Sequence, residues 1–257
     1  MNCACPAPII GGMEVTADLP QRIADWMRSI VHAAGGQGVV VGLSGGLDSA
    51  VVAALAKQAF GRNALGVIMP CGSLPADTRH GRFCARALAM ETFEANLTGV
   101  WHGLTAMLPD APQMAAGNVK PRLRMAVLYY LAAARNYLVA GTGNKSELMI
   151  GYFTKHGDGG ADLLPLGGLY KTQVRKLGAL VGLPAVFLKK PPSAGLWEGQ
   201  TDESEIGLTY DRLDPILAAL ENGGDTAGFE PSAVERVTML TAASQHKRCL
   251  PPMFLPE

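Results

Sequence analysis

Short apolar runs along the chain alternate with longer segments whose apolar residues recur every three or four positions. The runs at 38–43, 64–70 and 137–144 indicate strands, and 91–97 has room for another. The first run is rich in valine and suits a strand that is buried on both faces. Helical spacing of apolar residues predicts helices over 21–34, 50–60, 77–90, 118–136, 145–151, 169–181, 211–220 and 232–245.

Strands and helices that alternate in this order predict right-handed βαβ units, and therefore a parallel sheet with helices on both faces. Ligands of such α/β sheets bind beyond the carboxyl ends of the strands. This rule selects the segments 44–49 and 141–147, each of which follows a predicted strand. The polar segments at 153–168 and 189–206 have the length of lids, binding loops or disordered stretches.

Length and composition suit one folded unit. The chain has 257 residues, so we expect a single domain over 1–257, with 1–18 as a poorly ordered tail. A hydrophobic share of 48% and a charged share of 17% exclude a disordered polyelectrolyte. The 22 basic and 22 acidic residues cancel, which argues against a nucleic-acid partner. The most apolar stretch contains Arg135 and Asn136, so we expect no membrane span.

Cysteine usage favours a reducing, cytoplasmic setting. The five cysteines are odd in number and form no Cys-x-x-Cys pair, so a disulfide framework is not expected. Cys3 and Cys5 stand in a proline-rich start, where incidental thiols of a frayed terminus are a simpler interpretation than a metal site. No basic segment precedes an apolar one at the start of the chain, so we expect no signal peptide.

The segment 44–49, Ser-Gly-Gly-Leu-Asp-Ser, connects a predicted buried strand to a predicted helix. Its glycines allow a tight turn and a close approach of ligand to backbone. Free N–H groups at the start of the following helix favour an anion. Asp48 would repel a phosphate unless a cation lies between them, so the turn suggests a phosphate chain with Mg²⁺. The simpler alternative is an ordinary capped strand–helix turn.

The complete string Ser-Gly-Gly-x-Asp-Ser resembles the pyrophosphate loop of the N-type ATP pyrophosphatases. That superfamily includes NAD synthetases, GMP synthetases, asparagine synthetases and tRNA thiolation enzymes. The second half of the chain distinguishes among them. In order it contains GTGNKSE at 141–147, GYFTK at 151–155, GDGGAD at 157–162, LYKTQV at 169–174, PSAGLW at 192–197, GQTDE at 199–203 and HKR at 246–248.

Together these strings resemble ammonia-dependent NAD synthetase over roughly residues 20–252. The resemblance implies a doubly wound, parallel, five-stranded sheet of the adenine nucleotide alpha-hydrolase-like class. It also implies a ligase reaction in NAD biosynthesis. The carboxylate of deamido-NAD attacks ATP, pyrophosphate leaves, and ammonia converts the resulting NAD-adenylate into NAD and AMP. A carboxylate is a poor acceptor for ammonia, so this chemistry needs the adenylate leaving group.

The resemblance also assigns roles to individual residues. It implies that Asp48 and Glu147 hold Mg²⁺ and that Asp48, Lys171 and Asp162 take part in catalysis. We hypothesise that Asp162, as a buried carboxylate, helps ammonium to lose its proton. The implied ATP contacts are Gly42, Leu43, Ser44, Gly45, Gly46, Leu47, Asp48, Ser49, Thr142, Lys171 and Ser193. The implied deamido-NAD contacts are Arg122, Lys155, Asp162, His246 and Lys247.

Taken singly, most of these residues have a plainer interpretation. Arg122 suits a solvated helix face, and Glu147 suits a first-turn helix acid. His246 and Lys247 suit charges at the end of a helix. Only their joint order favours the functional interpretation. The stretch from Cys71 to Val100 matches the family less well, so the adenosine pocket is expected to differ there.

The family's wider properties imply a homodimer, to which the apolar helix at 118–136 would contribute. They also imply free ammonia as nitrogen donor, because no glutaminase domain is expected within 1–257. Two other classes stay open. A different adenylating enzyme of the same fold would use another acceptor. A nucleotide sensor would keep the phosphate turn, although it would be expected to lose Asp48 or Glu147.

Overall fold

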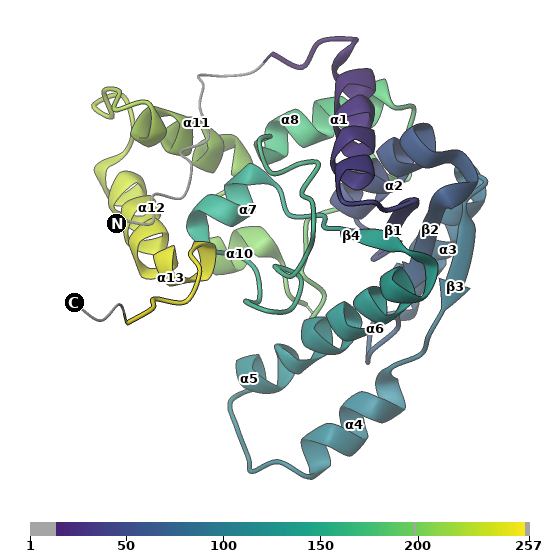
Figure 1. The fold of residues 1–257 in the computed structure, drawn as a ribbon. Coiled ribbons are helices and arrows are strands. Elements are labelled where there is room, and N and C mark those ends of the chain that lie inside the picture. Colours follow the sequence, from purple (N-terminus) through teal and green to yellow (C-terminus); the bar gives the residue numbers. More distant parts are fainter. Residues whose placement is uncertain (1–13, 198, 255–257) are drawn as a thin grey trace.

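The computed structural model describes residues 14–197 and 199–254 (Figure 1). Cys3 and Cys5 lie outside the described residues. So does most of the tail expected at 1–18, although Val15 within that tail packs against the main core.

Within residues 14–197 and 199–254, four parallel strands form the sheet, in the order β3-β2-β1-β4. They are β1 (Gly38–Gly42), β2 (Ala64–Ile68), β3 (Glu91–Glu94) and β4 (Tyr137–Ala140). Val40 of β1 lies opposite Leu65 of β2 on one side and Val139 of β4 on the other. All four strands predicted from the apolar runs are therefore present, and each is shorter than its run because the last residues enter turns.

The five-stranded sheet implied by the resemblance is wrong for the described residues, because the fifth position is a single bridge. Ala140 pairs with Leu163 in parallel, and Gly141 N–H donates to Leu163 O at 2.9 Å. Asp162 N–H donates to Val139 O at 2.9 Å. Pro165 follows, where a missing N–H and a turn end the pairing.

Helices cover both faces of the sheet, as the alternation of elements predicts (Figure 1). Val39 and Val41 of β1 pack into a core with Met27 and Leu55, whereas Val40 between them packs on the opposite face. The first face carries α1 (Leu19–Ala33), α2 (Leu47–Phe60), α3 (Pro75–Ala87) and α8 (Lys171–Leu180). The other face carries α6 (Val119–Arg135) and α4 (Thr98–Ala106).

A second, smaller core lies beside the sheet and is built only from helices and their connections (Figure 1, left). Tyr210, Leu213 and Leu217 are its most buried large side chains. Its helices are α7 (Lys145–Ile150), α10 (Asp202–Ile206), α11 (Tyr210–Glu221) and α12 (Pro231–Ala243). Because α7 follows β4 directly, this helical layer adjoins the carboxyl edge of the sheet.

All eight predicted helices are present, and the described residues form five further α-helices that were not predicted. The additional helices include α4 and α10, described above. The others are α5 (Gln113–Gly117), α9 (Ala185–Lys189) and α13 (Gln245–Arg248), beside a 3₁₀ turn, η1 (Gly61–Asn63). Most of them have five residues or fewer, which is too short for a periodic pattern.

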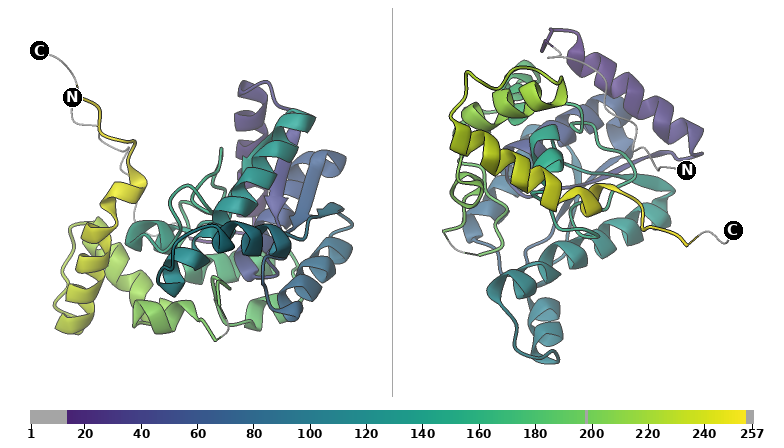
Figure 2. Two further views of the ribbon diagram at one scale, coloured as in Figure 1. Left: turned by 90° about the horizontal axis from the view of Figure 1, so that it is seen from below. Right: turned by 90° about the vertical axis from the view of Figure 1, so that its left-hand side faces the viewer.

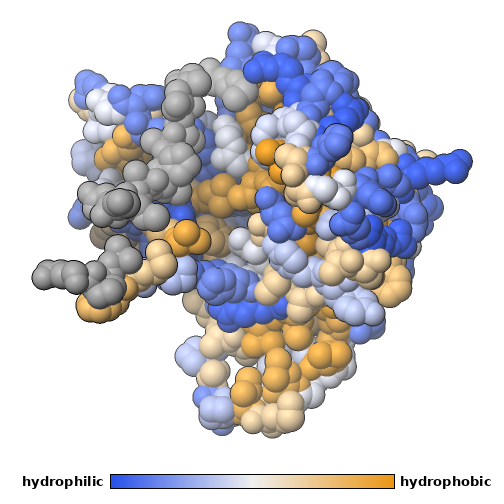
Figure 3. Space-filling view, in the orientation of Figure 1, coloured by the Kyte–Doolittle hydropathy of each residue, from blue (hydrophilic) through white to orange (hydrophobic). Residues whose placement is uncertain are grey.

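An apolar surface lies over α4 and α5, where Figure 3 shows hydrophobic atoms gathered at the lower end of the molecule. We define the α4–α5 patch as Val100, Met107, Leu108 and Met114, all of which are exposed, Met107 to 76%. Figure 2 shows that α4 projects from the body of the molecule. Among the described residues, no helix combines the length and apolar character that a bilayer crossing needs.

Candidate active site

The turn between β1 and α2 is braced by two serine hydroxyls. Ser49 Oγ donates to Gly46 O at 3.0 Å and lies 3.0 Å from Ser44 Oγ. Gly46, the residue before α2, supplies no side-chain cap to the helix. The first N–H groups of this 14-residue helix therefore point beyond the sheet edge without a side-chain acceptor there. That arrangement suits an anion.

Gly45 is required by packing as well as by backbone conformation. Its φ is +78°, and a Cβ at this position would lie 2.4 Å from Asp77 O and 2.8 Å from His80 Cβ. Lys190 also binds both segments: its Nζ donates to Gly45 O at 2.9 Å and to Asp77 Oδ1 at 2.8 Å. The turn is thus fixed between α3 and the segment that follows α9.

Asn144 joins the ends of the neighbouring strands β1 and β4. Its Oδ1 accepts from Glu147 N–H at 3.0 Å, and Glu147 Oε2 accepts from Asn144 N–H at 3.2 Å, so the two residues form a capping box for α7. Its Nδ2 donates to Asp48 Oδ1 at 3.3 Å. Asn144 was missed by the sequence analysis, although an Asn three residues before a Glu is a recognisable cap signal.

Lys171 lies between the two predicted metal carboxylates. Its ammonium donates to Asp48 Oδ2, and its Nζ lies 3.4 Å from Glu147 Oε1. The Lys171 side chain is only 4% exposed. Its Nζ also faces the ring of Tyr210 at 5.3 Å. The structure therefore brings Asp48, Glu147 and Lys171 together at the carboxyl edge of the sheet, as expected from the two strand ends.

Burial and charge set the ionisation of this group. Burial raises the pKa of Glu147 to about 8, although the Lys171 ammonium opposes the rise. Burial alone disfavours the charged form of Lys171, but Asp48 and Glu147 outweigh it and raise its pKa. Burial also raises the pKa of Asp202, and Lys171 again opposes the shift. Three carboxyl groups thus surround one ammonium.

Asp202 was quoted in a motif by the sequence analysis but given no role. It is 3% exposed, and Tyr210 donates its O–H to Asp202 Oδ2 at 3.1 Å. Its other oxygen, Oδ1, is buried without a hydrogen-bond partner. This excess of acceptor oxygen and negative charge suits a cation that a ligand brings with it.

The donor set fits Mg²⁺ in particular. Mg²⁺ is commonly held by one or two carboxylates together with substrate phosphates and water. Asp48 and Glu147 supply two such carboxylates. The described residues contain no cluster of three or more Asp, Glu, His or Cys side chains arranged as a complete metal cage.

Four predicted substrate-binding residues gather around the segment after α7. Arg122 donates to Lys155 O at 3.4 Å, and Lys155 Nζ donates to His246 O at 2.7 Å. Lys247 Nζ donates to Gly151 O at 2.7 Å and to the main-chain oxygen of residue 153 at 2.9 Å. These contacts link α6, the segment after α7, and α13, which are far apart in the chain.

Asp162 differs from expectation because the residue is exposed rather than buried. Its Oδ2 accepts from Val139 N–H at 2.7 Å, and its Oδ1 accepts from the Tyr129 hydroxyl at 3.1 Å. The first of these bonds holds residue 162 against β4, because its side chain accepts from a main-chain N–H of that strand. Among the described residues, Asp162 makes no hydrogen bond or ion pair to Asp48, Glu147 or Lys171.

Two further predicted ATP contacts, Thr142 and Ser193, lie outside the turn in the sequence. Thr142 is half-buried directly after β4. Ser193 Oγ donates to Gln200 O at 2.7 Å and accepts from Gly195 N–H at 3.1 Å, so it closes its own loop. Lys190, which precedes this loop, donates a hydrogen bond to Gly45 O in the phosphate turn.

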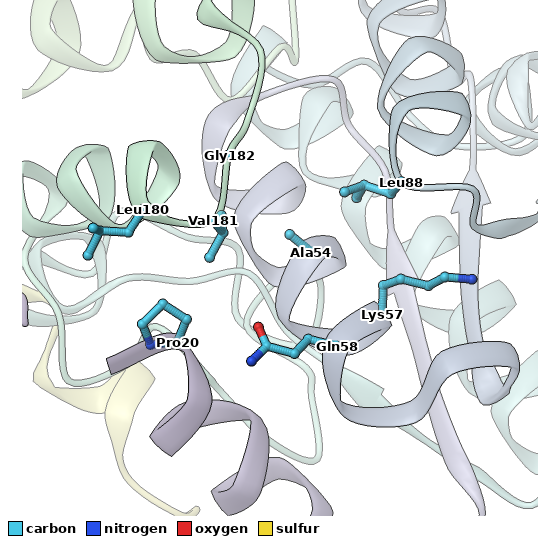
Figure 4. A pocket seen from close by; sticks show the side chains of 8 residues that line it. All are labelled: Pro20, Ala54, Lys57, Gln58, Leu88, Leu180, Val181 and Gly182. Carbon is cyan, nitrogen blue, oxygen red and sulfur yellow. The ribbon is translucent and has the colours of Figure 1, made fainter. Parts of the chain in front are cut away.

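A surface cavity of about 530 Å³ does not coincide with this chemistry. Figure 4 shows it lined by Ala54, Lys57 and Gln58 in the second half of α2, whereas the phosphate turn precedes that helix. A smaller cavity of about 230 Å³ adjoins the predicted substrate residues and is lined in part by Tyr152 and Lys247. We therefore locate the candidate active site by the cluster of Asp48, Glu147 and Lys171, and not by the size of a cavity.

A profile of the NAD synthase family matches residues 19–251, which include both strand ends and the Lys171 cluster. The chain belongs to the NAD synthase family. Among its relatives is an NH₃-dependent NAD⁺ synthetase of Carboxydothermus hydrogenoformans, 47% identical over 236 residues, with 90% of this chain and 94% of the relative covered. One from Archaeoglobus fulgidus is 44% identical, with 91% and 94% covered.

Solved structures of NAD synthase relatives share the fold. The NH₃-dependent NAD synthetase of Campylobacter jejuni, solved with a nitrate ion, gives a TM-score of 0.83 at 28% identity, with 95% of this chain and 100% of that chain covered. An NMN synthetase of Francisella tularensis gives 0.86 at 34% identity, with 94% and 99% covered. One structural relative of the chain is thus named for a mononucleotide product.

Proposed function

We propose that this NAD synthase family member forms NAD from deamido-NAD, ATP and ammonia, with AMP and pyrophosphate as the other products. The observation that carries the proposal is the contact of Lys171 with both Asp48 and Glu147 at the carboxyl ends of β1 and β4. Family membership and the identity to NH₃-dependent synthetases support the same reaction.

The proposed reaction has two steps. A nicotinate oxygen of deamido-NAD attacks the α-phosphorus of ATP, the bond to the β-phosphate oxygen breaks, and pyrophosphate leaves. Ammonia then attacks the acyl carbon of the adenylate, loses a proton, and displaces AMP. The first step develops negative charge on pyrophosphate, which oriented N–H groups and a fixed ammonium stabilise.

We assign the first step to the phosphate turn and Lys171. Residues 42–49 would receive the phosphate chain, because the turn ends in a helix N-terminus. Asp48 and Glu147 would hold Mg²⁺, which neutralises phosphate charge when bound. Lys171 would contact the leaving pyrophosphate as a buried point charge. Thr142 and Ser193 would complete the ATP site.

We assign deamido-NAD to the cluster of Arg122, Lys155, His246 and Lys247. The contacts of Lys155 and Lys247 described above bring this part of α6, the segment after α7 and α13 together. Asp162 would then contact deamido-NAD near the reacting end. Its exposure suits contact with a ligand, and a proton-accepting role would need the ligand to cover it.

We further propose a cytoplasmic homodimer that works as a single-domain subunit. The α4–α5 patch supports an association of two copies, because exposed apolar side chains gather there. Tyr130 on α6 is a further exposed aromatic side chain. Free ammonia is the proposed nitrogen donor.

The deciding experiment incubates the protein with deamido-NAD, ATP, Mg²⁺ and ammonium, and measures NAD, AMP and pyrophosphate. We expect the three products in equal amounts. Nicotinate mononucleotide replaces deamido-NAD in a parallel reaction, because one structural relative is named as an NMN synthetase. Glutamine replaces ammonium in another.

Each other outcome selects a different function. Faster turnover of the mononucleotide would assign NMN formation instead. AMP without either amide would indicate another acceptor on the same fold. ATP binding without any product would indicate a nucleotide sensor. Turnover with glutamine would contradict ammonia as the direct nitrogen donor.

A further inference from the structure

The first turn of the helix that carries Lys171 is held by side chains of two neighbouring helices. Within α8 itself, Gln173 Oε1 accepts from the N–H of Tyr170, the N-cap residue, at 2.8 Å. The next two N–H groups bond to other helices: Lys171 N–H donates to Ser146 Oγ of α7 at 2.9 Å, and Thr172 N–H donates to Asp214 Oδ2 of α11 at 2.9 Å. Two neighbouring helices therefore fix the first turn of α8.

Asp214 is the centre of this arrangement. It is 4% exposed, and both of its oxygens accept hydrogen bonds. Ser146 Oγ donates to Oδ1 at 2.5 Å, while Thr172 Oγ1 donates to Oδ2 at 2.8 Å. Burial raises the pKa of Asp214, and the hydrogen bonds from Ser146 and Thr172 oppose that rise. One buried carboxyl group thus ties α11 to α7 and α8.

The two helices held by Asp214 carry the two sides of the site. Ser146 directly precedes Glu147 on α7, and Thr172 directly follows Lys171 on α8. A shift of the Asp214 carboxylate would therefore change the separation of Glu147 and Lys171, which lie 3.4 Å apart across the site. Ser146 and Asp214 fix the main chain at Lys171 and Thr172, whereas Asp48 and Glu147 fix the Lys171 side chain.

We propose that Asp214 is a positioning residue for the reaction and acts through Lys171 by fixing the start of α8 against α7. This proposal rests on the proposed function. It goes beyond that function, because neither the motifs nor the assigned contacts include Asp214. Among the described residues, Asp214 makes no hydrogen bond or ion pair to the phosphate turn or the substrate cluster, so its effect on turnover is indirect.

Asp211 provides a matched control on the same helix. It also reaches from α11 to α8, where its Oδ1 lies 3.5 Å from Arg175 Nη1, but its side chain is 75% exposed. Removing its charge therefore weakens an α11–α8 contact without disturbing the helix start. The experiment compares Asp214→Asn with Asp211→Asn, in NAD formation with ammonium, at a temperature where both variants are folded.

We expect Asp214→Asn to lower kcat about ten- to a hundredfold, because a displacement of about 1 Å in a catalytic group has effects of this size. The KM for deamido-NAD should stay within about twofold of the wild-type value, since its proposed site is elsewhere. Asp211→Asn should keep the wild-type kcat. Equal kcat values for Asp214→Asn and Asp211→Asn would overturn the proposal.

A double-mutant cycle separates positioning from general destabilisation. If Asp214 acts through Lys171, Asp214→Asn should lower the residual kcat of a Lys171→Ala enzyme by less than about twofold. Independent, multiplicative losses would overturn the proposal. Should Asp214→Asn fail to fold, Ser146→Ala provides the second variant, because it removes the acceptor of Lys171 N–H. We expect the same loss of kcat and the same dependence on Lys171.

A chemical readout distinguishes failure of this proposal from failure of the proposed function. Acetylation of lysines by a small anhydride, followed by mass spectrometry, reports the accessibility of Lys171 without turnover. We expect Asp214→Asn to speed labelling of Lys171 several-fold relative to Lys120 of α6, which is similarly buried and donates to Leu196 O at 2.6 Å. An unchanged Lys171 rate would overturn the positioning role, whereas an inactive wild-type protein would overturn only the function.

Discussion

Lys171 Nζ lies 3.4 Å from Glu147 Oε1 while it donates to Asp48, so one ammonium serves two carboxylates that follow different strands. The two acids do not have equal surroundings. Burial raises the pKa of Glu147 to about 8, and the neighbouring Asp48 charge adds to the rise. The raised pKa favours a proton on Glu147 near neutral pH in the free protein, and a bound cation would displace that proton.

Without bound ligands, the protein should lose stability as the pH rises through the range in which Glu147 loses its proton. The pKa of Glu147 is about 4.5 in the unfolded chain and about 8 in the folded chain. Between these two pH values the folded state therefore binds more protons than the unfolded state. The free energy of unfolding should therefore fall with pH across that window. Glu147→Gln should flatten the fall, because glutamine does not titrate.

Urea denaturation with EDTA at about pH 5 and about pH 8 checks this prediction. The two proteins should differ less at the lower pH, where Glu147 is protonated and resembles glutamine. Asp202 and Asp214 also have raised pKa values, but they are present in both proteins. Parallel pH dependences for the wild type and Glu147→Gln would contradict the assignment.

Asp48→Asn should nearly abolish NAD formation, with a loss of at least about a thousandfold in kcat, because the site loses a metal carboxylate and the partner of Lys171. The fold should remain, since the half-buried position tolerates an isosteric amide. Activity assays and circular dichroism check both parts. Asp25→Asn, at an exposed position of α1, is the control. Wild-type turnover in Asp48→Asn would remove Asp48 from the metal site.

Gly45→Ala should prevent ATP binding, because its Cβ would lie 2.4 Å from Asp77 O and force the phosphate turn away from α3. Gly35→Ala is the matched control: Gly35 has a φ of +70°, and no atom lies within 4 Å of the added Cβ. That variant should lose only about 1–2 kcal/mol of stability from the left-handed backbone. Calorimetric titration with ATP checks the difference, and equal affinities would show that the turn does not require this packing.

Lys155→Ala should raise the KM for deamido-NAD about tenfold, as expected for the loss of a charged contact. The KM for ATP should change little, because Lys155 makes its contact with His246 O rather than with the phosphate turn. Initial rates at varied deamido-NAD check this. Arg212→Ala, an exposed cation paired with Glu230, should leave both KM values unaltered. An unchanged KM for deamido-NAD would remove Lys155 from its site.

Met107→Asp should dissociate the proposed homodimer, because it places a charge in the middle of the α4–α5 patch. Met239, an exposed methionine on α12, offers the control substitution Met239→Asp. Sedimentation velocity should show a dimer for the wild type and the control, and a monomer for Met107→Asp. A dimer that persists in Met107→Asp would locate the interface elsewhere.

Strands and long helices could be predicted because each has a regular pattern of burial. Val39, Val40 and Val41 are all buried, and this continuous run is typical of a strand covered on both faces. The fifth strand could not be excluded from the sequence, because Asp162 replaces regular pairing with a side-chain contact to Val139 N–H. Helices such as α10 were too short to show periodicity.

The candidate site was predicted in part. The turn at 44–49 and Glu147 follow strands, so their meeting at one sheet edge follows from the topology. Lys190 and Asp214 could not be found this way, because their contacts depend on how later helices pack. The contact of Lys190 with Gly45 spans 145 residues, and that of Asp214 with Thr172 crosses between separate cores. No local pattern encodes such pairings.

Asp48 lies far in sequence from the two residues that contact it, and this separation has a consequence for synthesis of the protein. Asn144 and Lys171, which contact it, follow by 96 and 123 residues. Contacts this distant form late, since a long loop must close before they stabilise anything. A nascent chain therefore exposes its phosphate turn long before the lysine that faces it has been made. Nucleotide binding would then begin only when most of the polypeptide has left the ribosome.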